Sequence, residues 1–126
     1  MKEAVREFDI EDRLIDFAVQ IIHVSDALPM NIVGRHVGKQ IIRSGTSPAS
    51  NYGEAQSAES RSDFIHKIKI CLKELRETRV WLKMIIRAKL IKSTFNIEAI
   101  INESDELISI FVASVKTAAQ NKRKTS

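Results

Sequence analysis

Every glycine and proline in this chain lies between residues 29 and 53. These two residue types interrupt α-helices most strongly, because glycine loses the most backbone entropy on ordering and proline lacks the amide proton. The flanking regions, residues 1–28 and 54–126, therefore contain no strong helix breaker. This distribution predicts long helices on both sides of the window.

The first of these regions carries a helical pattern of apolar residues. The pattern predicts a helix that ends near Ala27, because Pro29 disfavours helical geometry in the residue before it. Its apolar residues recur at steps of three and four, which is typical of one buried helix face. That face consists of Ile10, Leu14, Phe17, Ile21, Val24 and Leu28, widened by Ile15, Ala18 and Ile22.

A second helix is expected to begin after Asn31, which is a suitable N-cap residue. Pro48 would kink this helix rather than end it, so we expect one kinked helix from about 32 to 59. Two helices broken at 45–48 are the alternative. The stretch "SGTSPASNYGEAQSAES", residues 44–60, is rich in small side chains that would let another helix approach closely. The apolar face consists of Ile32, Val33, Val37, Ile41 and Ile42, and the small residues include Gly45, Ala49, Ala55 and Ala58.

Two further helices complete the pattern. The third begins at Ser60 or Ser62, with Ser62 expected as its N-cap, and its core face consists of Phe64, Ile68, Leu72, Leu75, Leu82 and Ile86. The fourth runs from about Asn96 to Gln120, is capped by Thr94 or Asn96, and buries Ile97, Ile100, Ile101, Leu107, Ile108, Phe111, Val115 and Ala118. The predicted fold is all-α: an antiparallel up-down-up-down four-helix bundle with a kinked second helix. It forms one domain over residues 1–120, followed by a short basic tail at 121–126.

The net charge of +4 is unevenly distributed along the chain. Residues 1–28 carry three Lys or Arg against seven Asp or Glu, whereas residues 61–92 carry ten against three. Five cations of the third helix share one face, over roughly 27 Å at 1.5 Å per residue. This basic ridge consists of Lys69, Lys73, Arg76, Lys83 and Arg87. It is a candidate for contacting the phosphates of RNA or DNA. A solvated face, or a partner for the acidic first helix, is the alternative.

Another face of the third helix suggests a contact between subunits. Ile70, Trp81 and Met84 project nearly opposite the core stripe, where a monomer would leave them in water. We therefore expect a homo-oligomer interface there. The alternative is a broad core stripe that extends further around the helix.

Arg79 lies in the middle of the apolar stripe of the third helix, and a buried guanidinium needs a carboxylate partner. Glu54 is the first candidate for this structural ion pair and Asp16 the second.

The sequence contains no arrangement that is typical of an active site. His23, His36 and His66 lack metal-ligand spacing, Cys71 is expected to be a buried apolar side chain, and no phosphate-binding glycine loop occurs. We expect no enzymatic activity, no metal site and no cofactor. No signal peptide or membrane span is recognisable, which predicts a cytoplasmic protein.

Residues 40–82, "QIIRSGTSPASNYGEAQSAESRSDFIHKIKICLKELRETRVWL", resemble the signature of a family of four-helix-bundle proteins. Members of this family are encoded by intervening sequences within bacterial 23S rRNA genes. The signature runs Q-x-x-R-[small]-x-x-S-x-x-x-N-x-x-E-[small], then a Ser/Arg-rich turn, D/E-F, and E-L-x-E-[ST]-x-x-W-L. The matching residues are Gln40, Arg43, Ser47, Asn51, Glu54, Ala55, Arg61, Phe64, Glu74, Glu77, Thr78, Trp81 and Leu82.

The resemblance implies an up-down bundle that assembles into a ring, often a pentamer. It also implies that the small residues of 44–60 pack closely against the third helix, with Asn51 and Glu54 as polar anchors in that contact. It does not imply a defined biochemical role. A related branch serves as the accessory protein of diversity-generating retroelements, in which a basic pentamer binds a reverse transcriptase and its RNA. The resemblance therefore implies RNA and a reverse transcriptase-type protein as possible partners.

Overall fold

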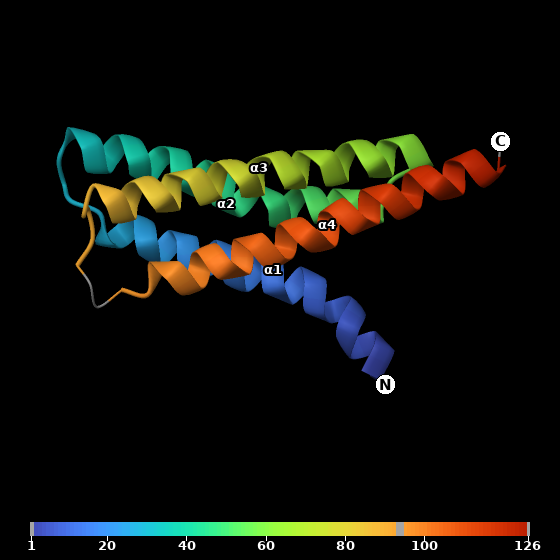
Figure 1. Ribbon diagram of the computed structural model, residues 1–126, viewed down its shortest axis with the longest axis horizontal. Helices are drawn as coiled ribbons and strands as arrows, with labels where there is room; N and C mark the ends of the chain where they lie inside the picture. The colour runs from blue at the N-terminus through green and yellow to red at the C-terminus, as the bar shows by residue number, and fades with distance from the viewer. Residues whose placement is uncertain (1, 93–94, 126) are drawn as a thin grey trace.

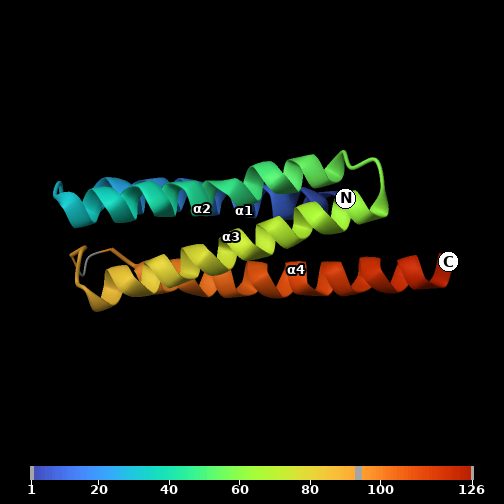
Figure 2. The ribbon, with the colours of Figure 1, turned by 90° about the horizontal axis from the view of Figure 1, so that it is seen from above.

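The computed structural model describes residues 2–92 and 95–125, and the side chains within 10–92 and 95–121. Its four helices are α1 (Lys2–Ala27), α2 (Ile32–Gln56), α3 (Arg61–Arg87) and α4 (Ile97–Thr125). Figures 1 and 2 show each helix running back along the one before it. The predicted all-α, four-helix class is confirmed.

The boundaries of α1 and α2 follow from local chemistry. α1 ends at Ala27, as the proline at position 29 predicts. Asn31 caps α2, because its side-chain oxygen accepts a hydrogen bond of 2.8 Å from the backbone N–H of Gly34. α2 is continuous through Pro48, so the alternative of two helices broken at 45–48 is wrong. The kink at Pro48 stays a prediction.

The N-cap of α3 lies two residues before the predicted one. Ser60, rather than Ser62, is the N-cap, and its hydroxyl accepts a 3.0 Å hydrogen bond from the N–H of Asp63. Ser62 already lies inside the helix. The capping bond reaches three residues forward, to the backbone N–H of Asp63. The carboxylate of Asp63 lies in the first turn, where a negative charge is stabilised by the helix dipole.

The start of α4 is capped by Asn96, whose side-chain oxygen accepts a 3.2 Å hydrogen bond from the N–H of Ala99. Thr94, the other predicted cap, lies outside the described residues. α4 continues to Thr125, beyond the predicted end at Gln120. The side chains of 122–126, most of the predicted basic tail, also lie outside the described residues.

Lys89 ends α3 by taking a left-handed conformation, with φ of 53°. The N–H groups of Lys89 and Leu90 bond to the carbonyl oxygens of Ile86 and Ile85, each at 3.1 Å. This is the Schellman arrangement, in which glycine usually occupies the left-handed position. No glycine occurs after residue 53, so a lysine carries the strain here.

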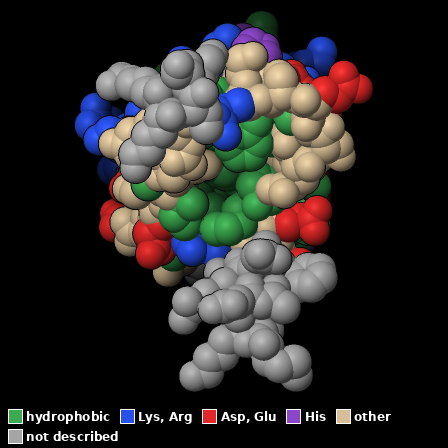
Figure 3. All heavy atoms as spheres, turned by 90° about the vertical axis from the view of Figure 1, so that its right-hand side faces the viewer, with side chains coloured by type: hydrophobic (Ala, Val, Ile, Leu, Met, Phe, Trp, Pro, Cys, Tyr) green, Lys and Arg blue, Asp and Glu red, His purple; other side chains and the backbone are tan. Residues whose placement is uncertain are grey.

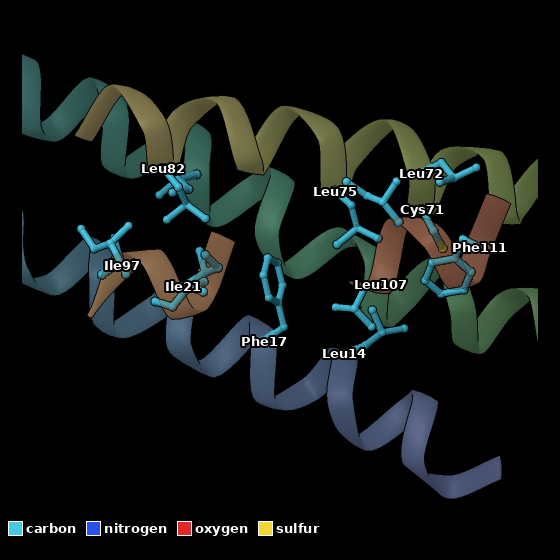
Figure 4. Close-up of a cluster of buried hydrophobic side chains, with 14 of the residues drawn as sticks. Leu14, Phe17, Ile21, Cys71, Leu72, Leu75, Leu82, Ile97, Leu107 and Phe111 are labelled. Carbon is cyan, nitrogen blue, oxygen red and sulfur yellow. The ribbon is translucent and has the colours of Figure 1, made fainter. Parts of the chain in front are cut away.

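The hydrophobic core is formed by side chains from all four helices. Figure 4 shows core side chains of α1, α3 and α4 pointing toward one another. Phe17 of α1, Leu75 of α3 and Leu107 of α4 are at most 1% exposed, and Ile41 of α2 is fully buried. Each such side chain contributes roughly 1.5–3 kcal/mol relative to exposure. The predicted inner faces of α1 and α4 are confirmed, with Ile10, Ile101, Val115 and Ala118 only partly buried.

Several predicted core residues face the solvent instead. On α3, Ile86 is 36% exposed and Ile85 is buried in its place. On α2, Val37 and Ile41 are buried, whereas Ile32, Val33 and Ile42 are exposed. The α1 face is not widened as predicted, except at Ala18. Three exposed β-branched side chains of α1, named here the outer apolar stripe, are Ile15, Val19 and Ile22.

The small residues of α2 allow close packing against both neighbouring helices. A Cβ added to Gly45 would lie only 2.6 Å from Cγ2 of Ile21, so this glycine permits α1 to approach. On the other side, the Thr78 hydroxyl of α3 donates a buried 2.8 Å hydrogen bond to Oγ of Ser44. We predicted close approach to α3 alone, but the run serves α1 as well.

The helices are arranged so that α1 and α3 lie at opposite corners. Backbone contacts join α1 to α2, α2 to α3 and α3 to α4, and join α1 to α4 less extensively, whereas α1 and α3 do not meet within the described residues. Arg13 connects α1 to α4 through ion pairs with Glu103 at 2.7 Å and Glu106 at 3.5 Å. Figure 3 shows the end of the bundle where α3 begins, with hydrophobic side chains gathered between charged ones.

Candidate nucleic-acid interface

The basic ridge forms on the outer face of α3. All five of its cations are exposed, and no carboxylate among the described residues forms an ion pair with any of them. The face arises because ridge positions recur at steps of three, four and seven, which keeps them on one side of a helix. The ridge consists, as predicted, of Lys69, Lys73, Arg76, Lys83 and Arg87.

The acidic first helix does not neutralise this ridge. α1 and α3 lie at opposite corners, so their outer faces point away from each other. The alternative that the ridge pairs with α1 inside the chain is therefore wrong. The exposed acidic residues of α1, which include Glu11, Asp12, Asp16 and Asp26, form a separate negative surface.

Carboxylates of α4 lie beside one border of the ridge. Glu98 lines a shallow hollow of about 230 Å³ together with Lys83 and Arg87. Asp105 accepts a 2.6 Å hydrogen bond from Arg79, which lies beside the ridge at the contact between α3 and α4. One border of the ridge is thus partly negative, and its outward side is purely basic.

Arg79 and Glu54 do not pair with each other, contrary to the prediction. Arg79 is one-third exposed and pairs with Asp105, because its side of α3 faces α4 rather than α2. Glu54 instead accepts a 2.7 Å hydrogen bond from Lys67, and this bond raises the pKa of the Lys67 ammonium. Asp16, the second predicted partner, lies on α1, which does not meet α3. Asn51 bonds to Ser47 within α2, so its described hydrogen bonds do not join two helices.

Besides the pair of Glu54 with Lys67, a polar contact centred on Arg43 joins α2 to α3. Its guanidinium donates a 2.8 Å hydrogen bond to Glu74, which is 7% exposed, and also pairs with Glu77. Glu77 in turn accepts a 3.1 Å hydrogen bond from the indole N–H of Trp81. Burying Glu74 without its cation would be costly, so Arg43 holds the two helices in register. Next to it lie the Ser44–Thr78 bond and Gln40, which accepts a 3.5 Å hydrogen bond from Arg43.

The sequence analysis quoted Gln40, Arg43, Glu74, Glu77 and Thr78 as part of a signature but gave these five residues no role. The signal was present: Glu74 and Glu77 are three residues apart, and Trp81 follows four residues later, so all three can lie on one side of the helix. We assigned the ion pair to Arg79 because it falls on the apolar stripe by helical spacing. The position of α4 relative to α3 was needed to correct this.

The three predicted interface residues do not share one environment. Met84 is 44% exposed, whereas Ile70 is partly buried. Trp81 packs against the core and makes an edge-on contact with His36 of α2, with ring centroids 5.9 Å apart. Trp81 therefore contributes to the contact between α2 and α3 in this chain. A role of the three in subunit contact stays a prediction.

Cys71 and the possible metal ligands are the other candidates for chemistry that the sequence raised. Burial raises the pKa of the Cys71 thiol to about 12, so this side chain is a neutral core residue at physiological pH. In the part of the chain that the structure describes, no three His, Cys, Asp or Glu side chains are placed to hold a metal ion. None of the helices, over their described residues, is long and apolar enough to cross a bilayer.

The sequence and the fold of the chain were compared with those of known proteins. The family model described as 23S rRNA-intervening sequence protein matches residues 6–113. The chain is 37% identical in sequence to a protein with unknown function from the S23 ribosomal protein family. That protein comes from Bacteroides thetaiotaomicron VPI-5482, and its crystal structure is known. The alignment covers 85% of this chain and 98% of that one, with a TM-score of 0.74. None of the curated proteins matches the chain.

Proposed function

Because this chain belongs to the family of 23S rRNA-intervening sequence proteins, we propose that it is a non-enzymatic bundle protein that binds nucleic acid through the basic ridge. RNA is the favoured ligand, since the family name refers to an rRNA gene. The observation that supports the proposal is the exposure of five cations on one helix face without any described carboxylate paired to them.

The chemistry of the ridge suits phosphate contact rather than base recognition. Lysine and arginine at intervals of about 5–10 Å along a helix can follow a phosphate backbone. Stacking platforms for bases require exposed aromatic side chains. The aromatic residue nearest the ridge in sequence, Trp81, is partly buried against α2. We therefore expect binding that depends strongly on charge and weakly on sequence.

The salt dependence of binding tests this directly. If all five cations contact phosphates, the plot of log Kobs against log salt should have a slope of about −3.5 for single-stranded RNA and −4.5 for duplex DNA. The measurement is a titration of the purified protein into labelled oligonucleotides at several salt concentrations.

A matched pair of variants separates the ridge from overall charge. Lys73→Glu with Arg76→Glu removes two ridge cations, whereas Arg35→Glu with Lys39→Glu makes the same charge change on exposed positions of α2. We expect the ridge variant to lose affinity and to flatten the salt slope by about 1.4 for single-stranded RNA and about 1.8 for duplex DNA, the share of two lost contacts. Equal losses in both variants would show that net charge alone attracts the nucleic acid, and would overturn the ridge assignment.

A protein-binding bundle is the second candidate function. The outer apolar stripe of α1 favours it, because β-branched side chains exposed at helical spacing are typical of surfaces covered by another chain. Absence of any nucleic-acid binding at low salt, where surface charges act most strongly, would leave this function.

A further inference from the structure

A cavity of about 880 Å³ lies at the end of the bundle where α3 is followed by α4, at the left of Figure 1. Small-molecule sites usually enclose roughly 300–1,000 Å³ and are lined mainly by apolar side chains. This cavity has such a lining, contributed by Ile85, Ile86, Ile91, Phe95 and Ile97. Ile85 and Ile97 are buried, whereas the other three keep part of their apolar surface in water, where a ligand can cover it.

Two lysines also line the cavity, Lys89 and Lys92. Both are exposed, and no carboxylate among the described residues forms an ion pair with either. The carboxylate that lines the cavity, Glu98, lies in the first turn of α4, where the helix dipole stabilises its charge. Glu98 also lines the neighbouring hollow together with Lys83 and Arg87. The cations around the cavity therefore outnumber its described carboxylate.

Lys89 holds its ammonium group at the cavity in a backbone conformation that favours glycine. Its φ is 53°, and a residue with a Cβ is less stable in this left-handed region than glycine is. Residues in such conformations cluster at functional sites. The chain keeps a cation here at a cost in stability, which favours a role for the charge.

We propose that this cavity binds a free medium-chain aliphatic carboxylate, with its chain against Ile86, Ile91 and Phe95 and its carboxylate at Lys89 and Lys92. Removal of the chain from water is the main favourable contribution. The two ammonium groups replace part of the hydration that the carboxylate loses, and they select an anion. Neither lysine belongs to the basic ridge, so this site does not depend on nucleic-acid binding.

Titration calorimetry of the purified protein with octanoate tests the proposal, and octanol serves as a neutral ligand with the same chain length. We expect one octanoate to bind per chain, with an affinity that falls as salt screens the lysines from the carboxylate. Octanol should bind without that loss. Absence of saturable octanoate binding would overturn the proposal, as would an octanoate affinity that salt does not lower.

Variants at Lys89 separate the ammonium group from the fold. Lys89→Gly removes the cation, and it should not weaken the fold because glycine takes positive φ without strain. We expect it to bind octanoate about two- to fivefold more weakly than the parent does, with octanol binding unchanged. Lys89→Arg keeps a cation at the same place and should bind octanoate as the parent does.

Lys116→Gln is the control for overall charge. Lys116 is exposed on α4, roughly 27 Å along the helix from Glu98, so its loss should leave the octanoate affinity unchanged. An equal loss of affinity in Lys116→Gln and Lys89→Gly would show that net charge alone attracts octanoate, and the assigned site would be wrong. Circular dichroism verifies that each variant keeps its helicity.

Glu98→Gln tests the sign of the charge effect. It removes the described carboxylate from the lining, so the affinity for octanoate should rise by about two- to fivefold, opposite to the effect of Lys89→Gly. The affinity for octanol should stay the same in both variants. A lower octanoate affinity in Glu98→Gln would place the head group of the ligand away from the lysines and would overturn the proposal.

Discussion

Gly45→Ala adds a single methyl group at the closest approach of α1 and α2. The new Cβ would lie 2.6 Å from Cγ2, 2.8 Å from Cγ1 and 3.0 Å from Cβ of Ile21. Ile21 is fully buried, and its branched Cβ restricts it to few rotamers in a helix, so it cannot turn away. The two helices must separate locally to admit the methyl group.

The expected cost follows from two opposing effects. Overpacking of a tight core costs about 1–3 kcal/mol. Replacing a mid-helix glycine by alanine regains about 1 kcal/mol of helix propensity. The net expectation for Gly45→Ala is destabilisation of up to about 2 kcal/mol, and the propensity gain hides part of the packing cost.

Gly53→Ala isolates the packing effect, because it is the same substitution in the same helix. A Cβ at Gly53 would have no atom within 4 Å. We expect Gly53→Ala to raise the free energy of unfolding by about 0.5–1 kcal/mol. The two variants should therefore differ by about 1–3 kcal/mol, the overpacking cost alone. Urea unfolding followed by circular dichroism, at one protein concentration, measures both.

An equal stabilisation by the two variants would refute the close contact of α1 with α2 at this point. Ile21→Ala provides an internal check, since it removes Cγ1 and Cγ2. In the Gly45→Ala background it should cost at least about 0.5 kcal/mol less than in the parent, the coupling expected for residues in contact.

Arg43→Met should lower the free energy of unfolding by about 1–3 kcal/mol, measured in urea, because it leaves the buried Glu74 carboxylate without its cation. The loss should be smaller than for a fully buried pair, since Arg43 is half-exposed. Arg35→Met, at an exposed position on α2, should change the free energy of unfolding little. Lys89→Gly should raise the free energy of unfolding by about 1 kcal/mol, because glycine takes positive φ without strain, and an unchanged or lower melting temperature would contradict the assigned conformation. Because the pKa of Cys71 is raised, the native state keeps the thiol protonated at pH values between about 9 and about 12, at which the unfolded chain has lost that proton. Stability should therefore fall as pH rises from about 9 to about 12, at up to about 1.4 kcal/mol per pH unit. Denaturant titrations of the parent and Cys71→Ala over this range should show the extra slope in the parent alone.

The interhelix polar contacts show where sequence reasoning stopped. Arg79 was assigned to Glu54, yet it pairs with Asp105, and the cations that do join α2 to α3 are Arg43 and Lys67. Spacing along one helix places a residue on a face of that helix. It does not determine which neighbouring helix covers the face, because that depends on the order of the helices around the bundle.

The α1 face illustrates the same limit in the core. Ile15 and Ile22 were predicted to widen the buried stripe, since they adjoin it in the helical pattern and are apolar. They are exposed, because the neighbours of α1 cover only its inner side. Apolar character alone cannot distinguish a wide core from a surface that another chain covers.

The sequence by itself determined that the chain is helical and that five cations share one face of α3. It also determined the end of α1 and the starts of α2, α3 and α4 to within two residues. These are properties of periodicity, capping residues and the confinement of glycine and proline to residues 29–53, all of which act over a few residues. Only the tertiary structure decided that α1 lies diagonally opposite α3, that Arg43 rather than Arg79 joins α2 to α3, and that an apolar stripe of α1 is left in the solvent. The reason is physical: these features depend on which helices are neighbours, and a helix's own pattern is equally compatible with several arrangements of its partners.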